Sequence, residues 1–196
     1  PNGHKITIAL EEMGLEYQIF PINILENDQF QPDFLRISPN NKIPAIVDQN
    51  GPNGEPISVF ESGAILQYLG RKTGLYYPEN EQDRVEVEQW LMWQMGGFGP
   101  MLGQNHHFGK FAKEQIPYAI DRYVTETKRL YAVLNKQLIG QKNVAGEYSI
   151  ADMAILPWVL RHEWQQIDLD DYPYVKEYVE RLTARPAVQR ALSIKV

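Results

Sequence analysis

Residues 41–45 have the sequence Asn-Lys-Ile-Pro-Ala and form the first motif whose groups could do chemistry. A proline at the start of an apolar segment removes one donor from a β-ladder and restricts the residue before it. If the Ile43–Pro44 peptide bond is cis, the main-chain N–H and C=O of Ile43 can pair with an extended peptide ligand at the sheet edge. The alternative is an ordinary trans proline at a strand start, which is the commoner case for X-Pro bonds.

The second motif, Phe-Glu-Ser-Gly-Ala at residues 60–64, lies at the expected start of a helix. The first N–H groups of a helix lack intrahelical partners, and together with the Ser62 hydroxyl they can bind a carboxylate. Glu61 can accept hydrogen bonds from a neighbouring ammonium group. The two residues would then hold the head group of an amino acid; the alternative is that they only cap the helix.

Asn2 belongs to the third motif, Pro-Asn-Gly at residues 1–3, directly before the first expected helix. Asn is a favourable N-cap residue, and a cap alone is one interpretation of this position. In the other interpretation, the Asn2 side-chain amide and the nearby backbone N–H groups stabilise a thiolate.

The composition limits what these motifs can do. The chain has no cysteine, which excludes a disulfide, a Cys-ligated metal and a Cys nucleophile, so any thiol chemistry must use the thiol of a ligand. The net charge of −6 argues against a nucleic-acid partner. The adjacent His106 and His107 would diverge on a helix and have no third ligand nearby, so we expect no metal site.

Membrane insertion is also not expected. The longest apolar run, residues 150–160, is interrupted by Asp152 and Pro157 and is too short to span a bilayer. Residues 1–14 lack the basic region and apolar stretch of a signal peptide. We therefore expect a cytoplasmic protein without a membrane partner.

The elements that must position these motifs fall into two groups. Residues 1–76 predict a mixed domain, with helices at 3–14, 32–37 and 61–72, strands at 16–22, 45–47 and 57–60, and a hairpin between the last two strands. Residues 80–196 predict an all-helical domain, with helices at 82–95, 116–138, 149–164, 173–185 and 186–194. A Ser149–Asp152 capping box should start the third of these helices, which is apolar nearly all round and should be central.

The mixed domain has the order of a thioredoxin-like fold without its first strand. A parallel pairing needs a strand on each side of its crossover helix, so we expect a further strand before Pro1 in the natural protein. A domain that tolerates the loss, or a different sheet order, are the alternatives. The predicted fold class is a thioredoxin-like α+β domain followed by an all-α domain.

Taken together, the motifs resemble the glutathione S-transferase family over nearly the whole chain. The resemblance is carried by Lys-Ile-Pro-Ala at 42–45, Glu-Ser-Gly-Ala-Ile at 61–65 and Ser-Ile-Ala-Asp at 149–152. Residues 1–5, 38–45 and 99–107 are most similar to its nu-class branch. That branch contains bacterial glutathione-dependent disulfide-bond oxidoreductases and is related to a yeast nitrogen-regulatory prion protein.

The resemblance implies a role for each matching residue. Glu61 and Ser62 would hold the γ-glutamyl group of glutathione, and Ile43, before a cis Pro44, would pair with the cysteinyl backbone. Asn2 would face the sulfur as the catalytic residue. In this branch a Thr just before the Pro-Asn-Gly stretch also contacts the thiol, and that residue would precede Pro1.

Further glutathione contacts implied by the resemblance come from more distant residues. Lys42 and Gln29 would contact the glycyl end, and Gln104 and Arg122 would approach the site across the interface of a homodimer. The implied activity is attack of a glutathione thiolate on a disulfide, with glutathione as cosubstrate and no metal. The alternatives are a transferase or peroxidase acting on electrophiles or hydroperoxides, and a non-catalytic interaction module.

Overall fold

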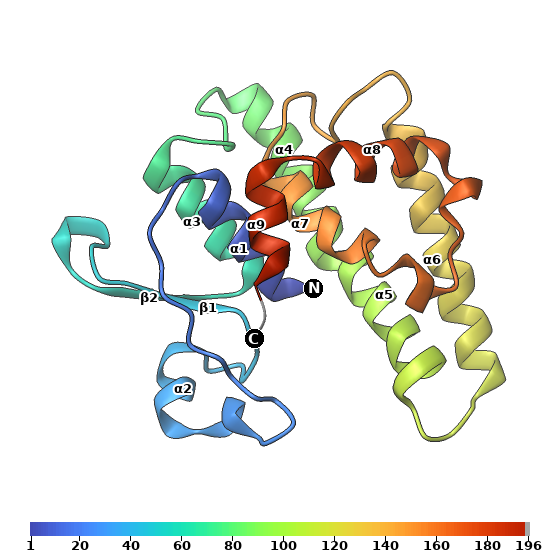
Figure 1. Cartoon of the computed structure of the whole chain (residues 1–196), viewed down its shortest axis with the longest axis horizontal. Coiled ribbons are helices and arrows are strands. Elements are labelled where there is room, and N and C mark those ends of the chain that lie inside the picture. Colours follow the sequence, from blue (N-terminus) through green and yellow to red (C-terminus); the bar gives the residue numbers. More distant parts are fainter. Residues whose placement is uncertain (195–196) are drawn as a thin grey trace.

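A computed structural model describes residues 1–194 (Figure 1). The N-terminal part contains two strands and three helices: α1 (Asn2–Glu12), α2 (Pro32–Ile37), β1 (Ala45–Asp48), β2 (Ile57–Phe60) and α3 (Ser62–Thr73). The remainder is helical: α4 (Glu81–Trp93), α5 (Gly99–His106), α6 (Pro117–Gln137), α7 (Ile150–Val159), α8 (Pro173–Thr183) and α9 (Pro186–Ser193). The division into a mixed part and a helical part is therefore as the sequence predicts.

The two strands form an antiparallel hairpin, as the turn residues predict. Their register runs from Ala45 opposite Phe60 to Asp48 opposite Ile57. The connecting turn uses left-handed backbone at Asn53 and Gly54, residue types that tolerate positive φ. This pairing places the residues before β1 and the residues after β2 at the same end of the hairpin.

The predicted strand at 16–22 is wrong. Within residues 1–194 the sheet consists of β1 and β2 alone, and residues 16–22 make no ladder hydrogen bonds. The expectation depended on a parallel neighbour before Pro1, and none of the described residues pairs with this segment. Tyr17 instead donates to Glu11 Oε1 at 2.7 Å, while the Phe20 side chain is 73% exposed.

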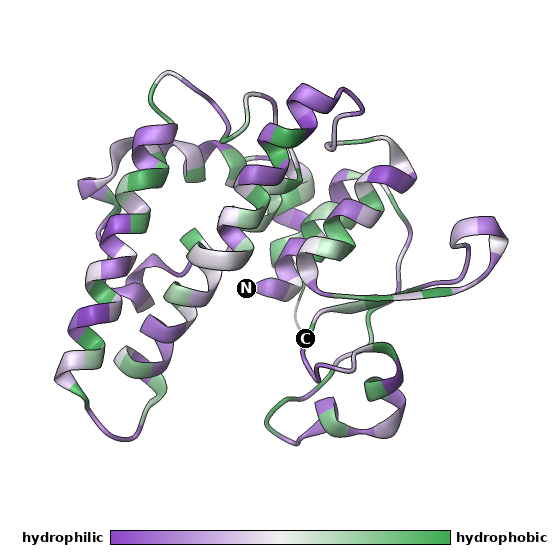
Figure 2. Cartoon of the chain, turned by 180° about the vertical axis from the view of Figure 1, so that it is seen from behind, coloured by the Kyte–Doolittle hydropathy of each residue, from purple (hydrophilic) through white to green (hydrophobic). Residues whose placement is uncertain are grey.

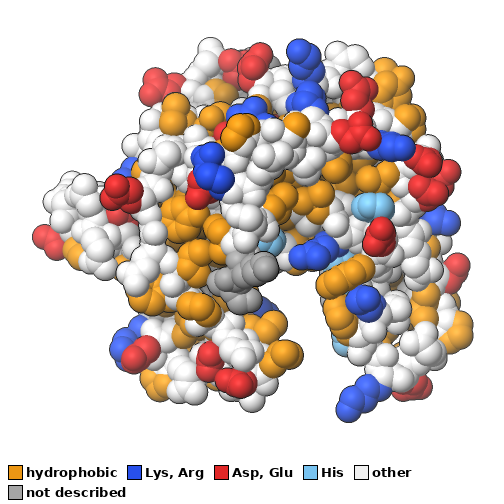
Figure 3. All heavy atoms as spheres, in the orientation of Figure 1, with side chains coloured by type: hydrophobic (Ala, Val, Ile, Leu, Met, Phe, Trp, Pro, Cys, Tyr) orange, Lys and Arg blue, Asp and Glu red, His pale blue; other side chains and the backbone are white. Residues whose placement is uncertain are grey.

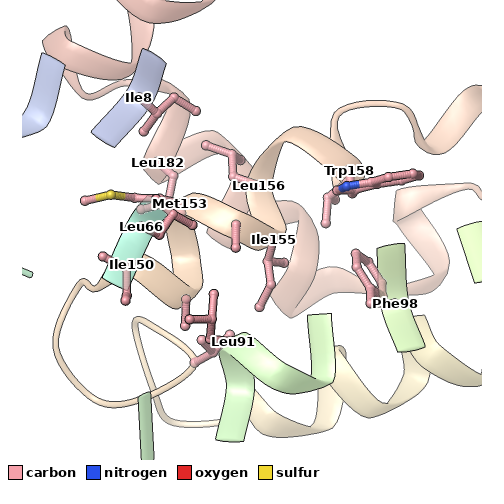
Figure 4. Close-up of a cluster of buried hydrophobic side chains, with 14 of the residues drawn as sticks. Ile8, Leu66, Leu91, Phe98, Ile150, Met153, Ile155, Leu156, Trp158 and Leu182 are labelled. Carbon is pink, nitrogen blue, oxygen red and sulfur yellow. The ribbon is translucent and has the colours of Figure 1, made fainter. Parts of the chain in front are cut away.

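The core is centred on α7, whose ten residues are all buried. Figure 4 shows its side chains between Ile8 of α1, Leu66 of α3 and Leu91 of α4. The predicted continuation of this helix to residue 164 is wrong, because the apolar run ends at Leu160. The polar residues that follow form a separate short helical turn, His162–Gln165.

The helix predicted at 82–95 does not stop at Gly96-Gly97. A π-helical turn, Gln94–Phe98, connects α4 directly to α5, so the chain stays helical from one to the other. Turns of this kind are rare, occur mostly as single turns inside α-helices, and are frequent at functional sites. The long helix α6 is amphipathic, as its sequence pattern predicts, with hydrophobic and hydrophilic residues alternating along it (Figure 2).

The first helix is held from several sides. It packs against α3, α7 and α9, and Glu12 accepts two hydrogen bonds from Arg185 at 2.6 and 2.8 Å. The Glu12 side chain is only 5% exposed, so this bidentate pair is shielded from water. The carboxyl end of α1 is thereby joined to Arg185 in the helical part.

The capping box at the start of α7 is confirmed. Asp152 is fully buried and accepts from the backbone N–H of Ser149 at 2.9 Å and of Val144 at 3.1 Å, and from the Tyr178 hydroxyl at 3.1 Å. Burial raises the pKa of Asp152 to about 6, against the lowering effect of these donors. One carboxylate thus satisfies groups from three segments of the helical part.

Replacement of Asp152 by Ala should destabilise the fold strongly. It leaves three buried donors without a partner, so we expect the free energy of unfolding to fall by about 3 kcal/mol. Urea unfolding measures this value. The control is Asp170→Ala, which removes a solvent-exposed ion pair with Lys176 and should change stability little; equal losses in both variants would contradict the role of Asp152.

Candidate functional site

A pocket of about 180 Å³ lies at the end of the hairpin, where the three motifs meet. Its lining residues come from α1, the segment between α2 and β1, and the β2–α3 junction: Asn2, Ser38, Asn40, Lys42, Ile43, Pro44, Phe60, Glu61 and Ser62. Figure 3 shows the molecular surface hollowed between the lobe that carries α2 and the ends of α5 and α6. The amino end of α1 lies near the head of this hollow (Figure 1).

The segment before β1 presents main-chain groups beside the pocket. The Ile43–Pro44 peptide bond is cis, as one of the two interpretations of the motif requires. The ladder begins only at Ala45, so Ile43 lies just outside it and is 41% exposed. The buried Ser38 hydroxyl donates to the Lys42 carbonyl at 2.7 Å and closes the turn that leads into this segment.

The side chains of Glu61 and Ser62 do not cap α3, although Glu61 occupies its N-cap position. Helix α3 begins at Ser62 without a side-chain hydrogen bond at its start, so the cap-only interpretation is wrong. The first helical bond runs from the Ile65 N–H to the Glu61 carbonyl at 2.9 Å, and the N–H groups of residues 62–64 precede it. Glu61 has left-handed backbone, φ 67° and ψ 116°, a conformation that costs a non-glycine residue about 1–3 kcal/mol.

Lys5 is a charged residue of the site that the motif analysis missed. Its side chain is buried, and its Nζ donates to Gln94 Oε1 at 2.6 Å and to Ser62 Oγ at 3.4 Å. Within residues 1–194 it forms no ion pair with a carboxylate. Burial lowers the pKa of Lys5 to about 7, while Glu61 acts in the opposite direction. The sequence feature that could have indicated this residue is the position of Lys5 beside the apolar residues of the first helix.

Asn2 lines the pocket but does not cap α1. The helix begins at Asn2 itself, and no side chain caps it, so the expected N-cap is wrong. The side-chain oxygen Oδ1 instead accepts from the Trp158 indole N–H at 3.0 Å. Because the oxygen is engaged, the side-chain NH₂ group is the donor that Asn2 offers to the pocket.

Three of the residues expected at the site lie elsewhere in this chain. Gln29 donates to the Ile24 carbonyl at 3.4 Å in the loop before α2, and Gln104 and Arg122 are exposed on α5 and α6. None of the three lines the pocket, and their contacts with a ligand stay predictions.

The two adjacent histidines differ in environment. His106 is 7% exposed and stacks on Trp158, with the ring centroids 5.6 Å apart, whereas His107 is exposed. In the part of the chain that the structure describes, no group of three or more His, Cys, Asp or Glu residues could hold a metal ion. Within the same residues, no helix has the length and hydrophobicity needed to cross a membrane.

Fold and site together define a class of protein. A thioredoxin-like half has a pocket between the start of a helix and a cis-proline, and an all-helical half packs against it. The chain belongs to the glutathione S-transferase family. Residues 1–71 match the family model of the glutathione S-transferase N-terminal domain, and residues 100–186 match that of the C-terminal domain.

Several relatives are similar over almost the full length. The chain is 56% identical to the disulfide-bond oxidoreductase YfcG of Escherichia coli K12 over 194 residues, covering 98% of this chain and 90% of YfcG. It is 43% identical to the disulfide-bond oxidoreductase YghU of the same organism, covering 97% of this chain and 70% of YghU.

The exact limits of the two domains, 1–76 and 80–196, stay a prediction.

The fold is also that of solved glutathione transferases. A Pseudomonas putida glutathione transferase with one glutathione disulfide bound per subunit matches with a TM-score of 0.95 and 46% identity, covering 100% of this chain and 88% of the other. A Burkholderia graminis glutathione transferase with two glutathione molecules bound per subunit matches with a TM-score of 0.93 and 46% identity, covering 98% and 83%.

The buried Lys5 should make stability depend on pH. Its pKa is about 7 in the folded protein and 10.5 ordinarily, so between these values the unfolded chain binds more protons and stability rises with pH. The slope from this one group approaches about 1.4 kcal/mol per pH unit. We expect Lys5→Met to remove that slope, measured by urea unfolding across this range.

The comparison needs a matched control. Lys128 is exposed on α6, and Lys128→Met should follow the pH dependence of the wild type. If the stability of Lys5→Met also depends on pH as that of the wild type does, the lowered pKa of a buried Lys5 is contradicted.

Proposed function

We propose that this protein is a glutathione-dependent disulfide-bond oxidoreductase. The observation that carries the proposal is that Asn2, Ile43–Pro44 and Glu61–Ser62 line one and the same pocket, in a chain without cysteine. A bound glutathione thiolate attacks one sulfur of a disulfide, forms a mixed disulfide and releases the other sulfur as a thiolate. A second glutathione thiolate then releases the substrate thiol and leaves glutathione disulfide.

The pocket offers complementary groups along a tripeptide. The Ser62 hydroxyl and the first N–H groups of α3 suit the γ-glutamyl carboxylate, and Glu61 suits its ammonium group. The main chain of Ile43, outside the ladder, suits antiparallel pairing with the cysteinyl residue. Lys42 is exposed at the rim and suits the glycyl carboxylate.

Lys5 adds a positive charge next to the proposed γ-glutamyl carboxylate site. Its Nζ lies 3.4 Å from Ser62 Oγ, on the buried side of the pocket. A carboxylate bound at Ser62 would bring a negative charge towards this ammonium group, in surroundings where charges interact more strongly than in water. We infer that Lys5 supports binding by this charge and by holding the Ser62 hydroxyl.

The thiol would be activated at the amino end of α1. A helix amino terminus favours negative charge, and the NH₂ group of Asn2 can donate to a sulfur. A shift of the thiol pKa from about 8.5 to about 7 needs about 2 kcal/mol of preferential thiolate stabilisation. A charge-assisted hydrogen bond together with the helix terminus is of that size.

The named relatives support this chemistry. YfcG and YghU are called disulfide-bond oxidoreductases, and the Pseudomonas putida structure holds a glutathione disulfide. That molecule has the composition of the product proposed here.

Assembly and location are proposed as well. We infer a homodimer in which Gln104 and Arg122 approach the neighbouring site, with Gln29 at the glycyl end. Val85 and Met92 support a contact face on α4, since they are 41% and 49% exposed and lie seven residues apart on one side of the helix. The protein would act in the cytoplasm, without a nucleic-acid or membrane partner.

Ser62→Ala tests the binding role. Because Ser62 would contact glutathione equally in the ground state and the transition state, we expect KM for glutathione to rise about tenfold, a loss of about 1.4 kcal/mol, with kcat nearly unchanged. The assay is reduction of hydroxyethyl disulfide by glutathione. Ser58→Ala, on the exposed side of β2, is the control.

The same assay decides the activity class. A wild-type protein without activity above background, or a Ser62→Ala variant with unchanged kinetics, would remove the proposal. Faster turnover of chlorodinitrobenzene than of the disulfide would favour a conjugating transferase instead.

Asn2→Ala tests the thiol-activating role. Loss of the side-chain donor should raise the pKa of the bound thiol by about one unit and lower kcat about fivefold near neutral pH, because the thiolate falls from about half to about a tenth of the bound thiol. Glutathione affinity, measured by calorimetry, should change little. The thiolate is measured by its ultraviolet absorbance as a function of pH, and an unchanged titration would contradict the role of Asn2.

A further inference from the structure

The side chain of Asn2 is oriented by a residue 156 positions away. The indole N–H of Trp158 donates to Asn2 Oδ1 at 3.0 Å. A side-chain amide presents an acceptor at one end and two donors at the other, and the two ends have nearly the same shape. The indole nitrogen is a donor only. It therefore selects the orientation in which the amide oxygen faces Trp158 and the NH₂ group is free for the pocket.

The ring of Trp158 is itself tightly packed. Its side chain is 8% exposed and stacks on His106 with an angle of 19° between the ring planes. It also lies against two glycines of α5: a Cβ on Gly99 would be 3.5 Å from the indole, and a Cβ on Gly103 would be 3.4 Å from it. Two glycines four residues apart on α5 leave a flat helix surface for the ring. Figure 4 shows Trp158 beside Phe98 at the edge of the core cluster.

A buried hydrogen-bond network fixes the backbone at Trp158. The Trp158 carbonyl accepts from Gln165 Nε2 at 2.8 Å, and the Tyr131 hydroxyl donates to Gln165 Oε1 at 2.6 Å. Because that oxygen is used, the Gln165 NH₂ group is the donor to His106 Nε2, 3.1 Å away. His106 must accept there as a neutral ring, in agreement with burial lowering its pKa to about 4.

We propose that Trp158 is a positioning residue for thiol activation: its indole N–H holds the Asn2 amide with the NH₂ group directed at the glutathione sulfur. This rests on the proposed function. Trp158 is not among the residues that line the pocket, so it acts through Asn2. The helical part of the chain thereby takes part in the chemistry of the thioredoxin-like part.

The decisive variant is Trp158→Phe. It keeps an aromatic ring against His106 and the two glycines but removes the N–H, so the Asn2 amide loses its orientation. We expect the pKa of the bound thiol to rise and kcat for hydroxyethyl disulfide to fall two- to fivefold near neutral pH, in proportion to the thiolate lost. The calorimetric Kd for glutathione should stay within about twofold, a change below 0.5 kcal/mol.

A double-mutant cycle separates positioning from a general effect on structure. In the Asn2→Ala background, Trp158→Phe should have no further effect on the thiol pKa or on kcat. The matched control is Trp164→Phe, since Trp164 also packs against His106, edge-on at 5.7 Å, but has no hydrogen bond to Asn2 among the described residues. This control should retain the wild-type thiol pKa.

The possible outcomes distinguish the two proposals. A lowered thiol pKa in the wild type that is raised by Trp158→Phe, with no further rise in the double variant, supports the positioning role. A lowered wild-type pKa that Trp158→Phe leaves unchanged, or effects of the two substitutions that simply add, overturns it while the proposed function stands. A wild-type complex whose thiol titrates like free glutathione overturns both.

Discussion

The pairing of β1 with β2 is the constraint on which the rest of the site depends. Because the strands are antiparallel, the residues that enter β1 and those that leave β2 lie at the same end of the hairpin. The cis-proline segment and the start of α3 are neighbours for this reason, although a turn separates them in sequence. A slip of one residue would reverse the faces of both strands and would separate Ile43 from Ser62.

The site contains two features that local energetics oppose. Glu61 holds a backbone conformation that non-glycine residues avoid, and Lys5 holds an ammonium group in the interior. Both persist because the surroundings are rigid: α1 packs against three other helices and is joined to Arg185 through Glu12. In this protein the stability of the core therefore maintains a pocket that would not form from its local sequence alone.

The helical part also shapes the pocket directly. The π-helical turn after α4 brings the Gln94 side chain to Lys5, and α7 brings Trp158 to Asn2. Gln94 and Trp158 do not line the pocket. They orient Lys5 and Asn2, which lie beside it or in its wall. Separation of the two parts would leave the binding motifs present but their side chains without fixed orientation.

The sequence alone determined the division into a mixed and a helical part, the hairpin, the capping box at Asp152 and the three motifs that border the pocket, because periodicity, turn chemistry and helix-start preferences act locally. It also favoured the family through three motifs. The tertiary structure alone decided the cis bond at Pro44, the engagement of Asn2 by Trp158, the burial of Lys5 and the absence of pairing for residues 16–22. These depend on which distant groups supply a hydrogen-bond partner or exclude water, and no local pattern specifies that.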